Sequence, residues 1–383
     1  MIRDLTDDEA RRALPCKWGE TEPGVIPAWV AEMDYALAPP ITDALRAAVE
    51  AGMAGYPSFD IGGELGEAYA GFSQRHFGHQ VDPAHVLPTV DVTAGVRLAL
   101  DVLSEPGPMV MPVPAYAPQL SVAQVTGRER VDLVVDPDAE RAEMDLDRLD
   151  ALFADGARTL LLTQPHNPWG RVFTREELEG VRDVVLRHGA RVISDEIHAP
   201  LALPGSEHVP YLSLEGTADH AVAVVATSKA FNTAGLRCAQ LVLPEPVTRK
   251  RVLSVPVARN DSWSVLGVVA AMAAYTRGDE WLASLIERLD SQRRLLADLL
   301  ETHLPQARMR PLEATYLAWI DLRAYGVADP AAVALARGRV RVAAGHDYHP
   351  GLEGHIRLNI ATSPDRLTEI IHRLATALAP SAS

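Results

Sequence analysis

The sequence predicts an α/β protein, with a large, mostly parallel sheet covered by helices and a second, smaller α+β domain. Three observations lead to this expectation. The 383 residues are too many for one small domain. Between about residues 85 and 245, short β-rich runs alternate with helical patterns, as in parallel sheets. From about residue 280 the alternation gives way to a long helix followed by shorter strands.

The strands of the large domain are expected where apolar runs do not alternate with polar residues, because strands buried on both faces have this pattern. Such runs cover residues 108–114, 159–163, 191–194, 221–226 and 240–243. Between them, Thr174 is expected to cap a helix that runs to about His188, with Glu177 completing a capping box. Ligands of such sheets bind beyond the carboxyl ends of the strands.

The smaller domain is expected to contain a helix over residues 281–302, strands over 315–321 and 355–360, and an amphipathic helix over 364–378. Ser363 is the predicted N-cap of that last helix, and proline follows it at the first helical position. We assign residues 41–280 to the large domain. Residues 1–40 and 281–383 are assigned to the small one.

Composition excludes several classes of protein. The chain has 36 Lys and Arg against 51 Asp and Glu, a net charge of −15, which argues against a nucleic-acid partner. Cys16 and Cys238 are too few for a disulfide framework, and no metal-ligand cluster is expected. The longest apolar run, 265–275, is shorter than a membrane span needs. With no signal peptide visible at the N-terminus, a cytoplasmic protein is expected.

Two ionisable residues stand just after predicted strands. Lys229 ends the segment ATSK, and a partly desolvated lysine at such a place can lose its proton near neutral pH and attack an aldehyde. Asp195 begins the segment DEIH, where an ionised carboxylate could keep a pyridine nitrogen protonated. Taken singly, the first could be a solvated surface lysine and the second an N-cap. His198 in the same segment could bond a ring oxygen of the ligand or only pack in the site.

Two further motifs suit other parts of one ligand. Prolines flank Asn167 in the segment QPHNPWG and aim its side chain, although a plain turn has the same composition. Gly95 stands near the start of a predicted helix, in TAGVRLAL over residues 93–100. The N–H groups and dipole of a helix start bind phosphate, but glycine at such a position is common.

Taken together, these motifs resemble the fold-type I pyridoxal-phosphate enzymes of the aminotransferase class I/II superfamily. The resemblance covers nearly the whole chain in the family's order. Within the superfamily, SKAFNTAGL at 228–236 and DEIH at 195–198 are similar to the cystathionine β-lyase branch, the MalY/PatB type of C–S lyase. KW at 17–18, PAWVAEMD at 27–34 and ATYLAW at 314–319 are similar to that branch too.

The resemblance implies a cofactor, pyridoxal 5′-phosphate, and roles for individual residues. Lys229 would bind the cofactor covalently and act as catalytic base, and Asp195 would pair with the pyridine nitrogen. Asn167 would bond the ring's 3′-oxygen, and Tyr116 would stack on the ring face. The remaining cofactor contacts would come from His198 and, around the phosphate, from Gly95, Val96, Arg97, Ser228 and Arg237.

The resemblance also implies a substrate site and a second subunit. Arg357 would bind the substrate's α-carboxylate, because a planar guanidinium can hold both oxygens, although a structural salt bridge is the alternative. Ala31 is assigned to the substrate site as well. Tyr56 would reach the phosphate of the neighbouring subunit's cofactor, so that a homodimer with a composite active site is expected.

Three departures from the branch bear on the reaction. Arg237 looks like the phosphate-binding arginine of aminotransferases, whereas C–S lyases often have an uncharged residue there. The sequence has GP at 107–108 where Gly-Asp is usual, and GHDYHP at 345–350 where Phe-Gly often follows the glycine. The last segment lies near the substrate in the family, so substrate choice stays open.

The expected reaction is α,β-elimination on cystathionine or another cysteine S-conjugate, giving thiol, pyruvate and ammonia. An aminotransferase is the alternative, since it shares every step up to removal of the α-proton. A non-catalytic regulatory protein is less consistent with the presence of the lysine, aspartate, asparagine and arginine together.

Overall fold

The central element of the structure, a computed structural model, is a seven-stranded sheet in the order β2-β8-β7-β6-β5-β3-β4. The structure describes residues 1–379 except 59–61, 257–258 and 261. β8 runs antiparallel to both of its neighbours, whereas the four pairings between β7, β6, β5, β3 and β4 are parallel. The strands are β2 (Val86–Thr89), β3 (Met109–Val113), β4 (Arg130–Val134), β5 (Thr159–Thr163), β6 (Arg191–Asp195), β7 (Ala221–Val225) and β8 (Ala239–Val242).

Helices cover both faces of this sheet, so its central strands are buried on both sides. In β5, Leu160 and Leu162 join one hydrophobic cluster, with α7 and α8, while Leu161 joins the cluster on the opposite face, with α4. The helices of this part are α2 (Pro39–Glu50), α3 (Gly62–Phe77), α4 (Val92–Leu103), α5 (Ala117–Leu120), α6 (Val122–Val125), α7 (Leu146–Ala154), α8 (Arg175–His188), α9 (Pro246–Leu253) and α10 (Val265–Arg277). This burial is why the strand sequences lack alternation.

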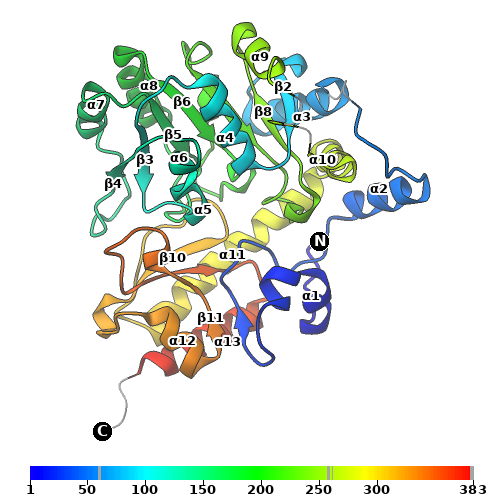
Figure 1. Ribbon diagram of the computed structural model, residues 1–383. Coiled ribbons are helices and arrows are strands. Elements are labelled where there is room, and N and C mark those ends of the chain that lie inside the picture. Colours follow the sequence, from blue (N-terminus) through cyan, green and yellow to red (C-terminus); the bar gives the residue numbers. More distant parts are fainter. Residues whose placement is uncertain (59–61, 257–258, 261, 380–383) are drawn as a thin grey trace.

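The rest of the chain forms a smaller part around a four-stranded antiparallel sheet in the order β12-β13-β10-β9. Figure 1 shows it below the large sheet, with α11 running from one part to the other. The N-terminal segment belongs to it through the parallel pair β1–β11. Its elements are α1 (Asp7–Ala13), β1 (Ile26–Pro27), α11 (Asp279–His303), β9 (Arg308–Met309), β10 (Leu317–Asp321), α12 (Pro330–Gly338), β11 (Val340–Arg341), β12 (Ala343–Ala344), β13 (His355–Asn359) and α13 (Pro364–Leu378).

The predicted α/β fold class is confirmed, as are the two helix starts that rest on capping chemistry. Thr174 and Glu177 form the reciprocal capping box of α8, which ends at His188. Ser363 accepts a hydrogen bond from the Arg366 N–H at the start of α13. The predicted strands agree with the observed ones to within two residues at either end. The assignment of residues 41–280 and 281–383 to separate domains stays an interpretation.

No helix in the described part of the chain is long and apolar enough to cross a membrane.

Candidate active site

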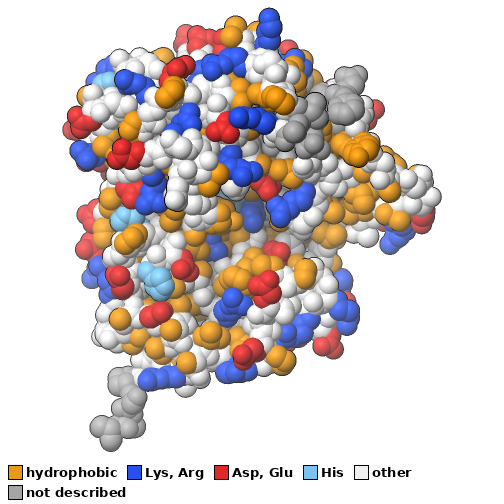
Figure 2. All heavy atoms as spheres, in the orientation of Figure 1, with side chains coloured by type: hydrophobic (Ala, Val, Ile, Leu, Met, Phe, Trp, Pro, Cys, Tyr) orange, Lys and Arg blue, Asp and Glu red, His pale blue; other side chains and the backbone are white. Residues whose placement is uncertain are grey.

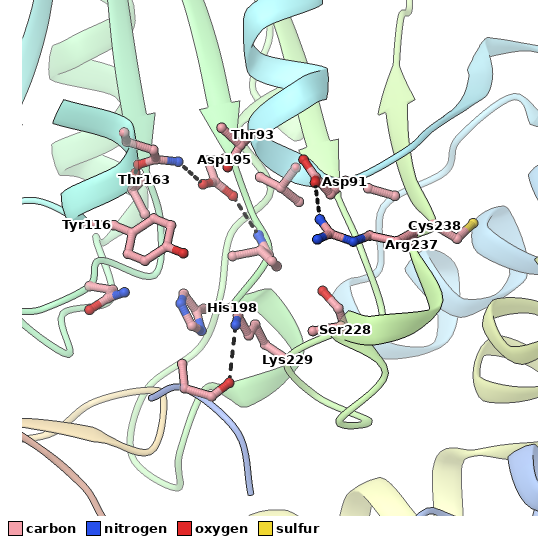
Figure 3. A pocket seen from close by; sticks show the side chains of 17 residues that line it. Asp91, Thr93, Tyr116, Thr163, Asp195, His198, Ser228, Lys229, Arg237 and Cys238 are labelled. Carbon is pink, nitrogen blue, oxygen red and sulfur yellow. Dashed lines mark hydrogen bonds and ion pairs between the residues drawn. The ribbon is translucent and has the colours of Figure 1, made fainter. Parts of the chain in front are cut away.

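A cavity lies at the carboxyl ends of β5, β6 and β7, the edge where ligands of parallel sheets bind. Its walls come from the segments that follow these strands, from the N-terminus of α4 and from the N-terminal segment near residue 31 (Figure 3). Many of the residues predicted for the site line it: Ala31, Tyr116, Asn167, Asp195, His198, Ser228, Lys229 and Arg237. Residues from five separate stretches of the sequence therefore meet in one place.

Lys229 follows β7 and places its amine at the centre of the cavity (Figure 3). Its Nζ donates a hydrogen bond to the Ala31 carbonyl oxygen, 3.2 Å away. Burial, and after it the nearby Arg357 guanidinium, lowers the pKa of this amine to about 8. A substantial fraction of the amine is consequently unprotonated near neutral pH, as a nucleophile or base must be.

Asp195 ends β6, is 2% exposed, and points into the cavity from the large sheet. One carboxylate oxygen accepts from the Gln119 amide at 2.5 Å and the other from the Ile197 N–H at 3.1 Å. Burial raises the pKa of the carboxyl to about 6, although these two hydrogen bonds oppose the rise. A cation placed against it, such as a protonated ring nitrogen, would stabilise the ionised form.

Gln119 and Thr163 are site residues that the sequence did not indicate. The Thr163 hydroxyl donates to the Gln119 side-chain oxygen at 3.1 Å, which turns the amide nitrogen toward Asp195. Both side chains are buried. Gln119 stands in α5, one turn after Tyr116, and only that spacing from the predicted stacking residue could have drawn attention to it.

The N-terminus of α4 opens into the cavity, but not through the residues that were predicted. Gly95, Val96 and Arg97 lie one turn inside the helix, and the Gly95 N–H is bonded to the Asp91 carbonyl at 2.9 Å. The lining residues of this helix are Val92 and Thr93, in its first turn. The structure thus does not bring Gly95, Val96 and Arg97, the residues predicted to bind the phosphate, into the lining of the cavity.

Gly95 has a packing role instead. A Cβ atom at this position would approach Val224 Cγ1 to 2.9 Å and Thr89 Cγ2 to 3.1 Å, so glycine allows α4 to lie close against β7 and β2. Arg97 is exposed and lies in a separate surface hollow with Arg259. The motif thus lies on the helix that reaches the cavity, about one turn after the residues that line it.

Arg237 and Asp91 meet at this end of the cavity. Asp91 caps α4 through the Ala94 N–H at 2.8 Å, and its other oxygen pairs with the Arg237 guanidinium at 2.6 Å. Arg237 has a left-handed backbone, with φ of 52°. Ser228 lines the same end. Free helix N–H groups, an arginine and a serine hydroxyl together form a phosphate-binding arrangement.

Arg357, on β13 in the smaller part of the molecule, lies beside the cavity and contacts its lining residue Asn167. It is 4% exposed, and its Nη1 donates to the Asn167 side-chain oxygen at 3.2 Å and its Nη2 to the Trp29 carbonyl at 2.7 Å. The Tyr348 ring lies under it, 5.0 Å from the guanidinium carbon. Its Nε has no hydrogen-bond partner, and no carboxylate in the described part of the chain pairs with it.

The other predicted residues differ in position. His198 is buried, its Nδ1 has no partner, and burial lowers its pKa to about 3, so the ring is neutral. Tyr116 lines the cavity beside Thr163 (Figure 3). Ala31 contributes its backbone carbonyl, which accepts from Lys229. Tyr56 is 97% exposed and does not line the cavity of its own chain.

The fold and these groups define a class of protein, the fold-type I pyridoxal-phosphate enzymes. A model of the family "Aminotransferase class I and II" matches residues 25–374, and the chain belongs to that family. Cystathionine beta-lyase from Corynebacterium glutamicum is 35% identical over 377 residues, 98% of this chain and 99% of the relative.

Solved structures agree with this placement. Cystalysin from Treponema denticola, whose structure contains pyridoxal 5′-phosphate, has a TM-score of 0.91 and 26% identity and covers 99% of each chain. A candidate PLP-dependent beta-cystathionase from Corynebacterium diphtheriae has a TM-score of 0.94 and 31% identity, covering 99% of this chain and 100% of that one.

Proposed function

We propose that the protein is a pyridoxal-5′-phosphate-dependent C–S lyase, which cleaves cystathionine or another cysteine S-conjugate to thiol, pyruvate and ammonia. One observation carries the proposal. Lys229 and Asp195 line one cavity, Arg357 lies beside it in contact with the lining residue Asn167, and in the described part of the chain none of the three forms an ion pair, although Asp195 and Arg357 are buried. Buried charges are costly unless they are paired. The cofactor and an amino acid together supply what is missing: a pyridinium for Asp195, a carboxylate for Arg357 and an aldehyde for Lys229.

The chain's residues fit the cofactor at each of its polar ends. The first turn of α4, Ser228 and Arg237 would hold the phosphate, and Asp195, oriented by Gln119, would keep the ring nitrogen protonated. The Asn167 oxygen already accepts from Arg357, which leaves its amide nitrogen free to donate to the ring's 3′-oxygen. Bound there, the cofactor provides an electron sink for the bond that breaks at the α-carbon.

The chain's own part in the reaction is binding and proton transfer. Arg357 would hold the α-carboxylate with both arms of its guanidinium, and the Tyr348 ring beneath would keep the guanidinium plane in place. The Lys229 amine would take the α-proton, and its lowered pKa makes the neutral amine available for this. His198, neutral and buried beside them, would pack in the site without adding charge.

An aminotransferase is the second candidate, because Arg237 lines the phosphate end of the cavity. The two reactions diverge only after the α-proton has moved. They are separated by incubating the protein with cystathionine, S-methylcysteine and ordinary amino acids and assaying thiol, pyruvate, ammonia and 2-oxo acids together. Thiol with pyruvate supports the lyase. A 2-oxo acid without thiol supports the aminotransferase, and a protein that stays colourless with pyridoxal phosphate contradicts both.

We also propose that the protein is a cytoplasmic homodimer whose subunits share their sites. The stretch between α2 and α3 carries Tyr56, fully exposed, beside a groove lined mainly by apolar residues. These include Met53, Val265, Val268, Val269 and Met272. Figure 2 shows hydrophobic side chains gathered over α2 and its surroundings, at the right of the molecule. An apolar patch of this kind is typical of a protein–protein interface.

A further inference from the structure

The Ala31 carbonyl oxygen has two hydrogen-bond donors, one partly buried and one fully buried. One is the Lys229 amine at 3.2 Å and the other is the Tyr316 hydroxyl at 3.0 Å. Tyr316 has no exposed surface. A carbonyl oxygen has two lone pairs, so these donors account for its whole accepting capacity. The tyrosine thus touches the group that holds the lysine without lining the cavity itself.

The residue before Tyr316 has an unfavourable backbone conformation, and Tyr316 follows it with its hydroxyl at the Ala31 carbonyl. Thr315 has φ of 71°, in the left-handed region, which a β-branched residue rarely adopts. Its N–H is bonded to the Leu201 carbonyl at 2.9 Å, and its hydroxyl oxygen accepts from the Leu317 N–H at 3.1 Å. Strain of this kind persists where the surroundings impose it, and it concentrates at functional sites.

We infer that Tyr316 is a positioning residue for Lys229, acting through the Ala31 carbonyl. This inference rests on the proposed function. A neutral amine has two N–H bonds and one lone pair, so an N–H directed at a fixed carbonyl also fixes the direction of the lone pair. In the reaction the α-C–H bond breaks and its proton goes to that lone pair, while the electron pair stays with the substrate and cofactor. Tyr316 keeps the carbonyl, and hence the base, in one orientation.

The hydroxyl also affects how readily Lys229 is protonated. The Tyr316 hydroxyl donates to the same Ala31 carbonyl oxygen that would stabilise a protonated Lys229 amine. Without the hydroxyl, that oxygen would accept from the ammonium alone, so the pKa of Lys229 should rise. The other charged or titratable groups around Lys229 include Arg357, which opposes protonation, Glu32, Asp195 and Cys16, which favour it, and the neutral His198. None of these is altered when only the Tyr316 oxygen is removed.

The test compares Tyr316→Phe with Tyr35→Phe. Tyr35 is a matched control because its buried hydroxyl also donates to a backbone carbonyl, that of Thr362 at 2.9 Å. With the cofactor-loaded enzyme, we expect Tyr316→Phe to lower kcat about tenfold or more, with KM unchanged. Exchange of the α-proton of alanine in D₂O should fall in parallel, and the acidic limb of the kcat–pH profile should move to higher pH. Tyr35→Phe should change none of these.

The rates are counted per cofactor-bearing site, from the visible absorbance, so a partly unfolded or partly loaded variant still gives a result. Equal exchange rates and equal pH limbs in Tyr316→Phe and Tyr35→Phe would overturn the inference. A wild-type protein that binds no cofactor or exchanges no α-proton would instead show that the proposed function has failed.

Discussion

At the scale of single residues, the Asp195 carboxyl is buried among neutral hydrogen-bond donors, an environment that suits a cationic ligand. Its carboxyl is buried with two hydrogen-bond donors, and its pKa is nevertheless raised to about 6. In the unfolded chain the same carboxyl ionises near 3.8. Because the folded state binds the proton more tightly, burial of this group destabilises the cofactor-free protein increasingly as the pH rises from 4 through 6.

Asp195→Asn should therefore stabilise the cofactor-free protein while it removes activity. Gln119 can turn its amide over, accepting from the new Asn nitrogen and donating to the Thr163 hydroxyl, so the network stays satisfied. We expect a gain on the order of 2–3 kcal/mol in unfolding free energy at pH 8, fading to nothing near pH 4. Urea unfolding at both pH values measures it. The kcat should fall at least about 100-fold, because asparagine cannot keep the ring nitrogen protonated.

Arg357→Lys tests the carboxylate site. A lysine amine cannot contact the Asn167 oxygen and the Trp29 carbonyl and also offer two parallel N–H groups to a carboxylate. We expect kcat/KM for S-substituted cysteines to fall about 100-fold, mainly through KM, with the cofactor absorbance retained. The matching S-substituted cysteamines, which lack the carboxylate, should bind the two proteins equally weakly. A similar loss of binding for both sets of ligands would contradict the assignment.

The sequence indicated the polar residues of recognisable motifs better than the groups that orient them. Lys229, Asp195 and Asn167 follow strand ends in motifs whose chemistry is unusual enough to recognise. Gln119 and Thr163 act only through Asp195, and a glutamine or threonine in a buried segment has no pattern of its own. Tyr316 is similar, since its role depends on a carbonyl that lies 285 residues away in the chain.

At the scale of elements, the start of α4 combines two functions with opposite charge requirements. Asp91 caps the helix, which favours a carboxylate at this end, but the carboxylate also lies beside the place where the cofactor's phosphate would bind. Arg237 offsets this charge through its ion pair with Asp91. The Arg237 guanidinium would consequently contact both the Asp91 carboxylate and the cofactor's phosphate.

Asp91→Asn should tighten cofactor binding. Asparagine caps helices as well as aspartate does, so α4 should keep its stability, while Arg237 becomes free to contact the phosphate. We expect the Kd for pyridoxal phosphate, measured by titrating cofactor-free protein, to fall about three- to tenfold at low salt and less at high salt. Asp145→Asn, which changes the same kind of cap at the start of α7 away from the cavity, should leave the Kd unchanged. Weaker binding by Asp91→Asn would place the phosphate elsewhere.

Elements differ in how far the sequence predicts them. The bounds of α8 and α13 are given by side chains that cap them, and those caps are local. Two strands of the large sheet were not predicted individually. β2 is buried throughout but short, and it contains Pro88, whereas β4 carries Arg130 and Asp132 and is only partly buried. Both lie at the sheet's edges, where proline and charged residues are tolerated and the local signal is weak.

At the scale of the whole molecule, Tyr56 is a predicted site residue that does not line the cavity of its own chain. It lies outside its own cavity and is almost fully exposed, next to the apolar groove of α10. If two copies associate through this groove, Tyr56 of each copy can contact the active site of the other. The dependence of one site on two chains can be measured without a structure of the dimer.

Mixing two inactive variants tests this dependence. Lys229→Ala lacks the base and Tyr56→Ala lacks the residue that the neighbour needs, so each homodimer should be inactive or nearly so. When the variants are mixed in equal amounts and allowed to exchange subunits, half of the dimers are mixed. In each of these, one site takes Lys229 from one chain and Tyr56 from the other, and it is complete. We expect recovery of about a quarter of the wild-type activity.

The same mixing distinguishes the arrangement of the dimer from its mere existence. If Tyr56 acted within its own chain, every site of a mixed dimer would carry one of the two substitutions, no site would be complete, and no activity would be recovered. Recovery must therefore depend on subunit exchange. Adding Met272→Glu to both variants places a charge in the apolar groove, and it should yield monomers in sedimentation and abolish the recovery. If activity is still recovered when both variants are monomeric, Tyr56 does not act in a site shared between two subunits.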